Sequence, residues 1–157
     1  MTDVPLIDTV SADSLTDLLQ DAGCRVNRSE QNGVVQLLSA SQGVGYGVRF
    51  GNRAPGKDGE FLDFTFSCAL RIQGELPLGL AERWNATRRF ARLSVQGEYL
   101  VMEMDVVVAD GVSQKHLLGS LLLWDRVLQE FIVYLRDYSR HNAEQPSQAP
   151  VEGATAS

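Results

Sequence analysis

The chain has 157 residues, and 14 Lys and Arg against 20 Asp and Glu give it a formal charge of −6. This acidic balance argues against nucleic acid as the partner, because phosphate binding needs clustered Lys and Arg. The sequence has neither an apolar run long enough for a membrane span nor the basic, apolar start of a signal peptide, so we expect one globular domain in the cytoplasm. Cys24 and Cys68 form neither a disulfide framework nor a metal-binding spacing, which agrees with a reducing compartment.

A helix is predicted after an N-terminal extension of residues 1–10. Ser11 has the side chain of an N-cap, and Gly23 stands where a helix usually ends in a left-handed residue. The apolar face of this helix consists of three leucines, Leu15, Leu18 and Leu19. We therefore expect the segment between positions 11 and 23 to pack on the core through this face.

Four strands are predicted to follow this helix. Residues 24–29 form the first strand, which ends before a tight-turn dipeptide at positions 32–33, and residues 34–40 form the second. Residues 44–50 and 62–70 alternate between large apolar side chains and small or polar ones. This alternation is typical of antiparallel strands that bury one face.

A second helix and a hairpin are predicted next. Pro77 suits the first turn of a helix that runs to about Arg88. The hairpin turns at residues 97–98, and this two-residue turn sets the pairing of its strands. The register gives three pairs of apolar residues that we expect to face inward: Val95 with Leu100, Leu93 with Met102, and Ala91 with Met104. On the outer face, the same register places Arg92 opposite Glu103.

The last helix is predicted to begin after the N-cap Ser113 and to run to about Tyr138. Residues 139–157 lack apolar periodicity and are predicted to be a disordered tail. The domain therefore covers residues 11–138, and its elements follow the order α-β-β-β-β-α-β-β-α. Hairpin connections without βαβ alternation indicate an α+β fold with a single antiparallel sheet.

The last helix carries apolar side chains on more than one of its faces. Most of them, including Trp124, project to one half of the helix. Leu118, Leu122 and Val133 instead fall in the arc of the charged residues. A second apolar stripe indicates a second surface to contact, such as another protomer or a partner. The alternative is that these are three scattered surface residues.

Several motifs lack the context that their chemistry needs. Residues 44–47 have the core sequence of a potassium-channel filter, but no membrane helices surround them, so we expect a strand whose glycine face allows close approach of a backbone. Residues 51–57 have phosphate-loop spacing, but Asp58 stands where Ser or Thr must hold magnesium, and we expect an inter-strand loop. His116 and His141 have no catalytic or ligating partner at a recognisable spacing.

Glu103 and Asp105 lie two residues apart on one face of a predicted strand. Paired carboxylates can divide the roles of acid and base in catalysis. However, Arg92 is expected opposite Glu103, and the outer face of an antiparallel strand normally carries charges. These residues therefore favour a structural interpretation.

A series of residues in the second half of the chain carries a family pattern: Trp84-Asn85, Arg89-Phe90, Arg92, Met102-Glu103-Met104-Asp105, Gly111-Val112, Leu121, Leu122, Trp124, Leu128 and Phe131. This series resembles the YbjN-like family, whose members are described as bacterial sensory-transduction regulators with a fold like that of type III secretion chaperones. With the elements upstream, the resemblance covers residues 11–138. It implies a small cytoplasmic protein, often paired, without a known catalytic centre.

The resemblance also implies an architectural role for the residues of this motif. They would seat the middle helix on the following hairpin, with Trp84 as the anchor and guanidinium groups reaching carboxylates such as Glu103 and Asp105. The residues of this motif are Trp84, Asn85, Arg89, Phe90, Arg92, Glu103, Asp105 and Trp124.

We therefore predict a protein-binding module without enzymatic activity, either a regulator or a chaperone-like protein, which forms a homodimer. Its narrower form is a secretion chaperone that holds a bound segment along the sheet by strand addition or in apolar grooves. No catalytic residue, metal or cofactor is expected. The alternative is a small-ligand sensor or enzyme with a pocket between the sheet and the middle helix, which would use Tyr46, Arg49, Arg92, Glu103 or Asp105.

Overall fold

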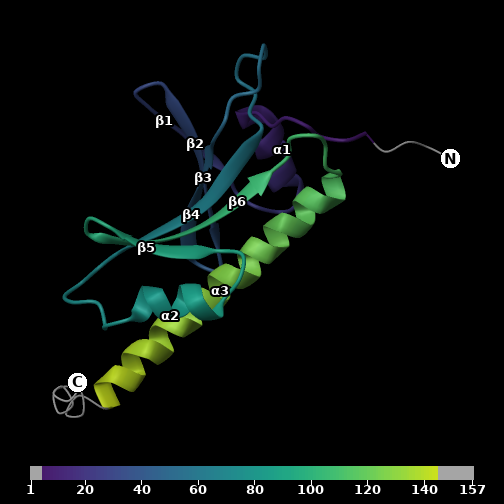
Figure 1. Cartoon of the computed structure of the whole chain (residues 1–157). Helices are drawn as coiled ribbons and strands as arrows, with labels where there is room; N and C mark the ends of the chain where they lie inside the picture. Colours follow the sequence, from purple (N-terminus) through teal and green to yellow (C-terminus); the bar gives the residue numbers. More distant parts are fainter. Residues whose placement is uncertain (1–4, 145–157) are drawn as a thin grey trace.

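A computed structural model of the chain describes residues 5–144, which form a six-stranded antiparallel sheet and three helices (Figure 1). The elements are α1 (Ala12–Asp21), β1 (Asn27–Gln31), β2 (Val34–Ser41), β3 (Val44–Phe50), β4 (Asp63–Arg71), α2 (Leu80–Thr87), β5 (Arg92–Gln96), β6 (Tyr99–Val107) and α3 (Gln114–Glu144). The predicted element order and the α+β class are confirmed.

The sheet has the strand order β1-β2-β3-β4-β6-β5. Strands β4 and β6 form the longest ladder, which runs from the pair Asp63 and Val107 to the pair Arg71 and Tyr99. The connection through α2 therefore carries the chain past β6 to the outer strand β5, and β6 returns between β4 and β5. Strands β1 and β5 are the two edges of the sheet.

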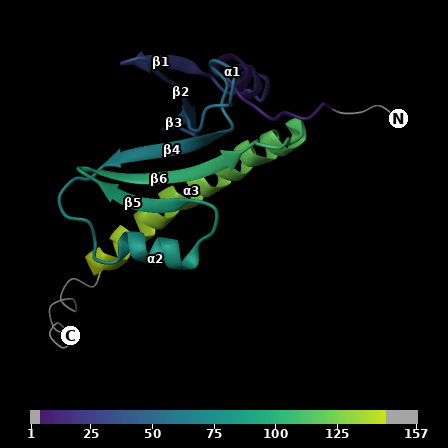
Figure 2. The same cartoon turned by 45° about the horizontal axis from the view of Figure 1, so that its top comes forward.

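The helices lie against one face of the sheet, with α3 running alongside β4 and β6 and α2 beside β5 (Figures 1 and 2). Trp124 of α3 is fully buried and stacks on Phe66 of β4 at a centroid distance of 5.3 Å. The leucines of α1 join the same core cluster. The opposite face of the sheet carries the alternate side chains, among them Arg49, Ala69 and Asp105, which are exposed. Within the described residues, no helix is long and apolar enough to cross a membrane.

Local signals in the sequence placed several elements correctly. The Ser11 side chain accepts a hydrogen bond from the Ser14 backbone at 3.0 Å, and Gly23 has a φ of +95°. The Ser113 side chain accepts from the His116 backbone at 3.0 Å, as an N-cap does. The hairpin register is confirmed for three pairs: Val95 with Leu100, Leu93 with Met102, and Arg92 with Glu103.

Other expectations about the ends of elements were wrong. Helix α2 begins at Leu80 instead of near Pro77, because Gly79 precedes it with a φ of +79° and interrupts the helical backbone. Strand β1 begins three residues later than predicted, at Asn27. Val95 lies on the same face as the buried Leu93 but is 53% exposed, because β5 is an edge strand.

The ends of β5 and α3 also differ from the predictions. Ala91 does not pair with Met104, because β5 begins at Arg92, after Phe90 adopts a φ of +80°. Helix α3 continues to Glu144, beyond the predicted end at Tyr138, since each added residue gains a backbone hydrogen bond once a helix is formed. The rest of the predicted tail, residues 145–157, and residues 1–4 lie outside the described residues.

Candidate functional site

Helix α2 is fastened to the edge strand β5 by two adjacent side chains. Trp84 is fully buried, and its indole N–H donates to the Ala91 carbonyl at 3.1 Å. The Asn85 amide donates to the Leu93 carbonyl at 2.9 Å and accepts from the Leu93 N–H at 2.8 Å. Asn85 therefore occupies the backbone groups that Leu93 would offer to an added strand. The β5 edge is closed to strand addition at its centre.

Two tyrosines of α3 hold α2 and the segment before it. The Tyr134 hydroxyl donates to the Leu80 carbonyl at 2.7 Å, and the Tyr138 hydroxyl donates to the Leu78 carbonyl at 2.7 Å. Burial raises the pKa of the Tyr134 phenol above its usual value. Trp84 packs edge-on against the Tyr134 ring at a centroid distance of 5.2 Å. Helix α2 is thus fixed beside α3 by both packing and hydrogen bonds.

Arg88 follows directly after α2 and lies on this aromatic pair. Its guanidinium carbon is 5.0 Å from the Trp84 ring centroid and 5.4 Å from that of Tyr134. Its hydrogen bond to the Thr87 hydroxyl is long, at 3.5 Å. Such cation–π contacts hold the flat face of the group and leave its N–H edge free for another acceptor.

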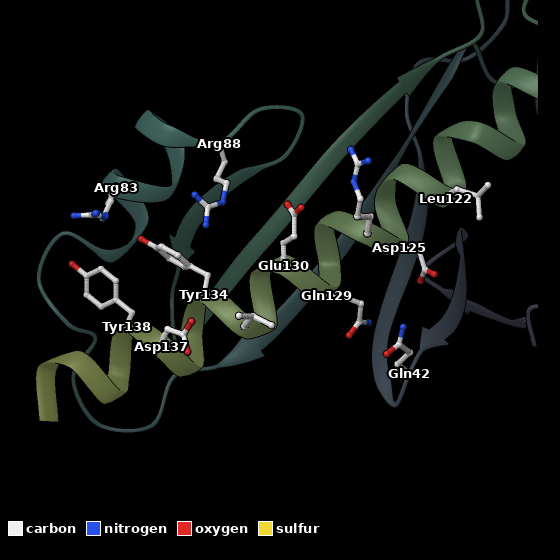
Figure 3. A pocket seen from close by; sticks show the side chains of 12 residues that line it. Gln42, Arg83, Arg88, Leu122, Asp125, Gln129, Glu130, Tyr134, Asp137 and Tyr138 are labelled. Carbon is white, nitrogen blue, oxygen red and sulfur yellow. The ribbon is translucent and has the colours of Figure 1, made fainter. Parts of the chain in front are cut away.

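An open groove of about 1200 Å³ lies along α3, between α2 and the turn that joins β2 to β3 (Figure 3). We call it the α2–α3 groove. It is lined by Gln42, Arg83, Arg88, Leu122, Asp125, Arg126, Gln129, Glu130, Val133, Tyr134, Asp137 and Tyr138. Leu122 and Val133 lie on its α3 side and are 68% and 42% exposed. At the β2–β3 turn, the Gln129 amide donates to the Ser41 carbonyl at 3.2 Å.

The charged residues of the groove are arranged by element. Arg83 and Arg88 come from α2 and the residue after it, whereas Asp125, Arg126, Glu130 and Asp137 come from α3. Among the described side chains, residues 5–138, no carboxylate lies within ion-pair distance of Arg83, Arg88 or Arg126. The two arginines on the α2 side of the groove therefore have no ion-pair partner among the described side chains.

The three residues of the predicted second stripe have different positions. Leu122 and Val133 line the α2–α3 groove, whereas Leu118 is partly buried and packs against the core. Arg83 and Arg88 were not predicted from the sequence as groove residues. No local pattern relates them to α3, because Arg88 is 34 positions from Leu122 and Arg83 lies farther still along the chain.

A second cluster of charges lies on the face of the sheet opposite α3. Glu103 is only 6% exposed, and its carboxylate forms ion pairs with Arg49 and, at 3.3 Å, with Arg92. Arg92 also pairs with Asp105 at 2.9 Å, and the Thr65 hydroxyl donates to Asp105 at 2.7 Å. The hydrogen bond from Arg92 lowers the pKa of Asp105, and Asp105 in turn raises the pKa of Arg92. The charges of the two arginines and the two carboxylates cancel. The ion pairs of the cluster hold neighbouring strands of the sheet together.

The pocket expected for a small ligand is not assembled as predicted. Tyr46 lies on the α3 side of the sheet, where burial raises its pKa to about 12 and its ring packs against Trp124 at 5.7 Å. Arg49, Arg92 and the two carboxylates lie on the opposite face. Side chains alternate along a strand, so Tyr46 and Arg49, three positions apart on β3, point to opposite sides. The five residues therefore do not line one pocket beside α2.

The remaining motif residues take separate positions. Arg89 lies over the Phe90 ring, with its guanidinium carbon 5.0 Å from the ring centroid, and it reaches neither carboxylate of the cluster. Phe90 is 55% exposed. His116 is exposed near the start of α3, and the side chain of His141 lies outside the described residues. Within the described residues, no group of three His, Cys, Asp or Glu side chains could hold a metal ion.

A known family covers most of the chain. The model of a family named YbjN, described as "Putative bacterial sensory transduction regulator", matches residues 11–136. These limits include α1, the whole sheet, α2 and the part of α3 that lines most of the groove. No curated protein matches the chain.

Proposed function

The chain belongs to the YbjN family, and from this premise we propose that it is a non-enzymatic regulator that binds a helical segment of another protein in the α2–α3 groove. The observation that carries the proposal is the exposure of Leu122 and Val133 in a concave site. Large apolar side chains exposed in a groove rimmed by polar residues are typical of protein interfaces. The groove thus offers apolar contacts for affinity and charged walls for orientation.

The nature of the groove walls favours a helix over an extended segment. An extended segment binds mainly through backbone hydrogen bonds to a sheet edge, but α2 and α3 satisfy their own backbone groups. At the β5 edge, Asn85 already occupies the backbone groups of Leu93. Leu122 and Val133 are eleven positions apart on α3, or about 16 Å along its axis. A partner helix with apolar side chains at similar spacing can contact both residues.

We also propose that the isolated protein is a homodimer in which the α3 helices of two copies pack antiparallel. A two-fold axis near the middle of α3 would bring Leu122 against Val133 of the second copy, so the surface is self-complementary. The second copy and a partner helix would then compete for one groove. We place the protein in the cytoplasm, a proposal supported by the free thiols of Cys24 and Cys68.

Light scattering of the purified protein tests the dimer. We expect the wild type to have twice the chain mass, and Leu122→Glu to have the mass of one chain, because a charge would be buried in the interface. Val34→Glu is the matched control, since Val34 is 65% exposed on β2 and does not line the groove. A monomeric wild type would refute the dimer. A dimer that persists in Leu122→Glu would refute this interface.

Affinity capture from native lysate, quantified by mass spectrometry, tests partner binding. Wild type, Leu122→Glu and Val34→Glu serve as parallel baits. We expect at least one protein to be captured by the wild type and the Val34→Glu control and to be lost with Leu122→Glu. If the baits are well folded and well expressed and no captured protein is lost with Leu122→Glu, this result would count against a partner in the groove.

A further inference from the structure

We propose that Arg88, assisted by Arg83, makes the α2–α3 groove selective for a partner helix that carries an acidic residue on the side facing α2. This inference rests on the proposed function, because it assumes that a helix occupies the groove. It adds the chemistry of that helix: apolar side chains over Leu122 and Val133, and one Asp or Glu at the α2 wall.

Arg88 has the geometry of a preorganised carboxylate receptor. Its guanidinium lies near two aromatic rings, Trp84 at 5.0 Å and Tyr134 at 5.4 Å, and Figure 3 shows its side chain pointing from the end of α2 toward Tyr134. Trp84 is fully buried and Tyr134 is held by its hydrogen bond to Leu80, so this platform is rigid. A guanidinium held in this way loses less conformational entropy when its planar N–H edge binds a carboxylate with two hydrogen bonds.

The N–H edge of Arg88 lacks a strong acceptor in the described part of the chain. Its one hydrogen bond, to Thr87, is 3.5 Å long, and no described carboxylate is within ion-pair distance. Arg83 lines the same wall and likewise has no ion pair among the side chains of residues 5–138. By contrast, Arg49 and Arg92 on the open face of the sheet are both paired with carboxylates. The two arginines without an ion pair among the described side chains therefore lie where a partner would bury them.

The acids of α3 limit where the partner's carboxylate can lie. Asp125, Glu130 and Asp137 line the α3 side of the groove, and among the side chains of residues 5–138 only Asp137 of these three has a cation within ion-pair distance, Arg136 at 3.9 Å. They would repel an acidic residue placed over α3 and attract a basic one. A partner helix with one acidic edge toward α2 is favoured, whereas a helix that is acidic all round is not. The charges thus select the orientation of the helix as well as its composition.

A selection from a defined library tests the inference without a known partner. The probe is a phage library of alanine-rich helices of about 15 residues with randomised surface positions. It is selected on wild-type protein, immobilised at low density so that second copies do not fill the groove, and counter-selected on Leu122→Glu. We expect the surviving peptides to share one position enriched in Asp or Glu.

Binding of a selected peptide and of its Glu→Gln variant is then measured by fluorescence anisotropy. We expect the Glu→Gln change to weaken binding to the wild type by about tenfold or more, and binding to Arg88→Gln by less than about twofold. Arg89→Gln is the matched control, because Arg89 is the adjacent arginine and lies over Phe90 outside the groove lining. With this control, the tenfold effect should remain.

Folding and binding effects of Arg88 can be separated with further variants. Circular dichroism shows whether Arg88→Gln keeps its helices. Arg88→Lys retains the charge but loses the planar fork, and Arg83→Gln removes a charge that does not contact the aromatic pair. We expect both to reduce the difference between the Glu and Gln peptides only in part.

The possible results distinguish the inference from the proposed function. Selected peptides that need Leu122 but show no acidic enrichment would overturn the inference and leave the groove as a binding site. A Glu→Gln effect that persists in folded Arg88→Gln and Arg83→Gln would overturn it as well. If no peptide depends on Leu122, the proposed function and the inference fail together.

Discussion

Replacement of Asn85 by Ala should destabilise the protein by releasing the edge strand β5. Asn85 makes two hydrogen bonds to Leu93, of 2.8 and 2.9 Å. Each intramolecular hydrogen bond contributes about 0.5–1.5 kcal/mol, so the loss of both amounts to about 1–3 kcal/mol. Asn85 is exposed, and water can replace part of what is lost. We therefore expect the free energy of unfolding to fall by about 1–2 kcal/mol, in the lower part of this range.

Urea denaturation followed by the fluorescence of the buried Trp84 and Trp124 measures this loss. We expect the midpoint to fall with an unchanged m-value, because the folded state remains compact. Amide hydrogen exchange at Leu93 should accelerate in Asn85→Ala. The neighbouring substitution Ala86→Ser, at an exposed position of the same helix, serves as the control and should change stability by no more than about 0.5 kcal/mol. A loss below about 0.5 kcal/mol in Asn85→Ala, with unchanged exchange at Leu93, would refute the role assigned to this amide.

Two further predictions concern titration and thiol reactivity. The hydrogen bond from Arg92 lowers the pKa of Asp105, so this carboxylate stabilises the fold above its unfolded pKa and loses that contribution as the pH falls through its folded pKa. In urea denaturation, Asp105→Asn should be about 0.2–1 kcal/mol less stable than wild type at pH 7, and the difference should shrink below about pH 4; a constant or growing difference toward pH 3 would contradict this. Burial raises the pKa of the Cys68 thiol to about 11, so a maleimide at pH 8 should modify the partly exposed Cys24 first and Cys68 only after unfolding. Equal modification rates in the native protein, read by mass spectrometry, would show that Cys68 is accessible.

The elements could be predicted from the sequence because their signals act over a few residues. Ser11 and Gly23 bound α1 through a local hydrogen bond and a local backbone conformation. The two-residue turn of the β5–β6 hairpin sets the register that pairs Leu93 with Met102. Alternation along a strand also indicates which side chains share a face, although it does not show how far the core extends. Val95 shows this limit, because it lies on the correct face but at an uncovered edge.

The candidate site was predicted only in part. The sequence shows that Leu122 and Val133 lie off the main apolar face of α3, because all side chains of a helix follow the same helical period. Their position beside Arg83 and Arg88 is not visible in the sequence. Helices α2 and α3 come together only when α2 lies beside β5 and α3 packs on the same face of the sheet. The ion pair of Glu103 with Arg49 is similarly hidden, as the two residues are 54 positions apart and meet only because β4 pairs with both β3 and β6.

The order of helices and strands, their caps and the hairpin register follow from neighbouring residues, and the amino-acid sequence alone determined them. The strand order, the closed edge at Asn85 and the groove between α2 and α3 were decided only in the tertiary structure. Several antiparallel pairings of the same strands would satisfy local hydrogen bonding equally well. The choice among them depends on which arrangement buries the apolar faces of α1, α2 and α3 on one side of the sheet, and that burial sums contacts between residues far apart in the chain.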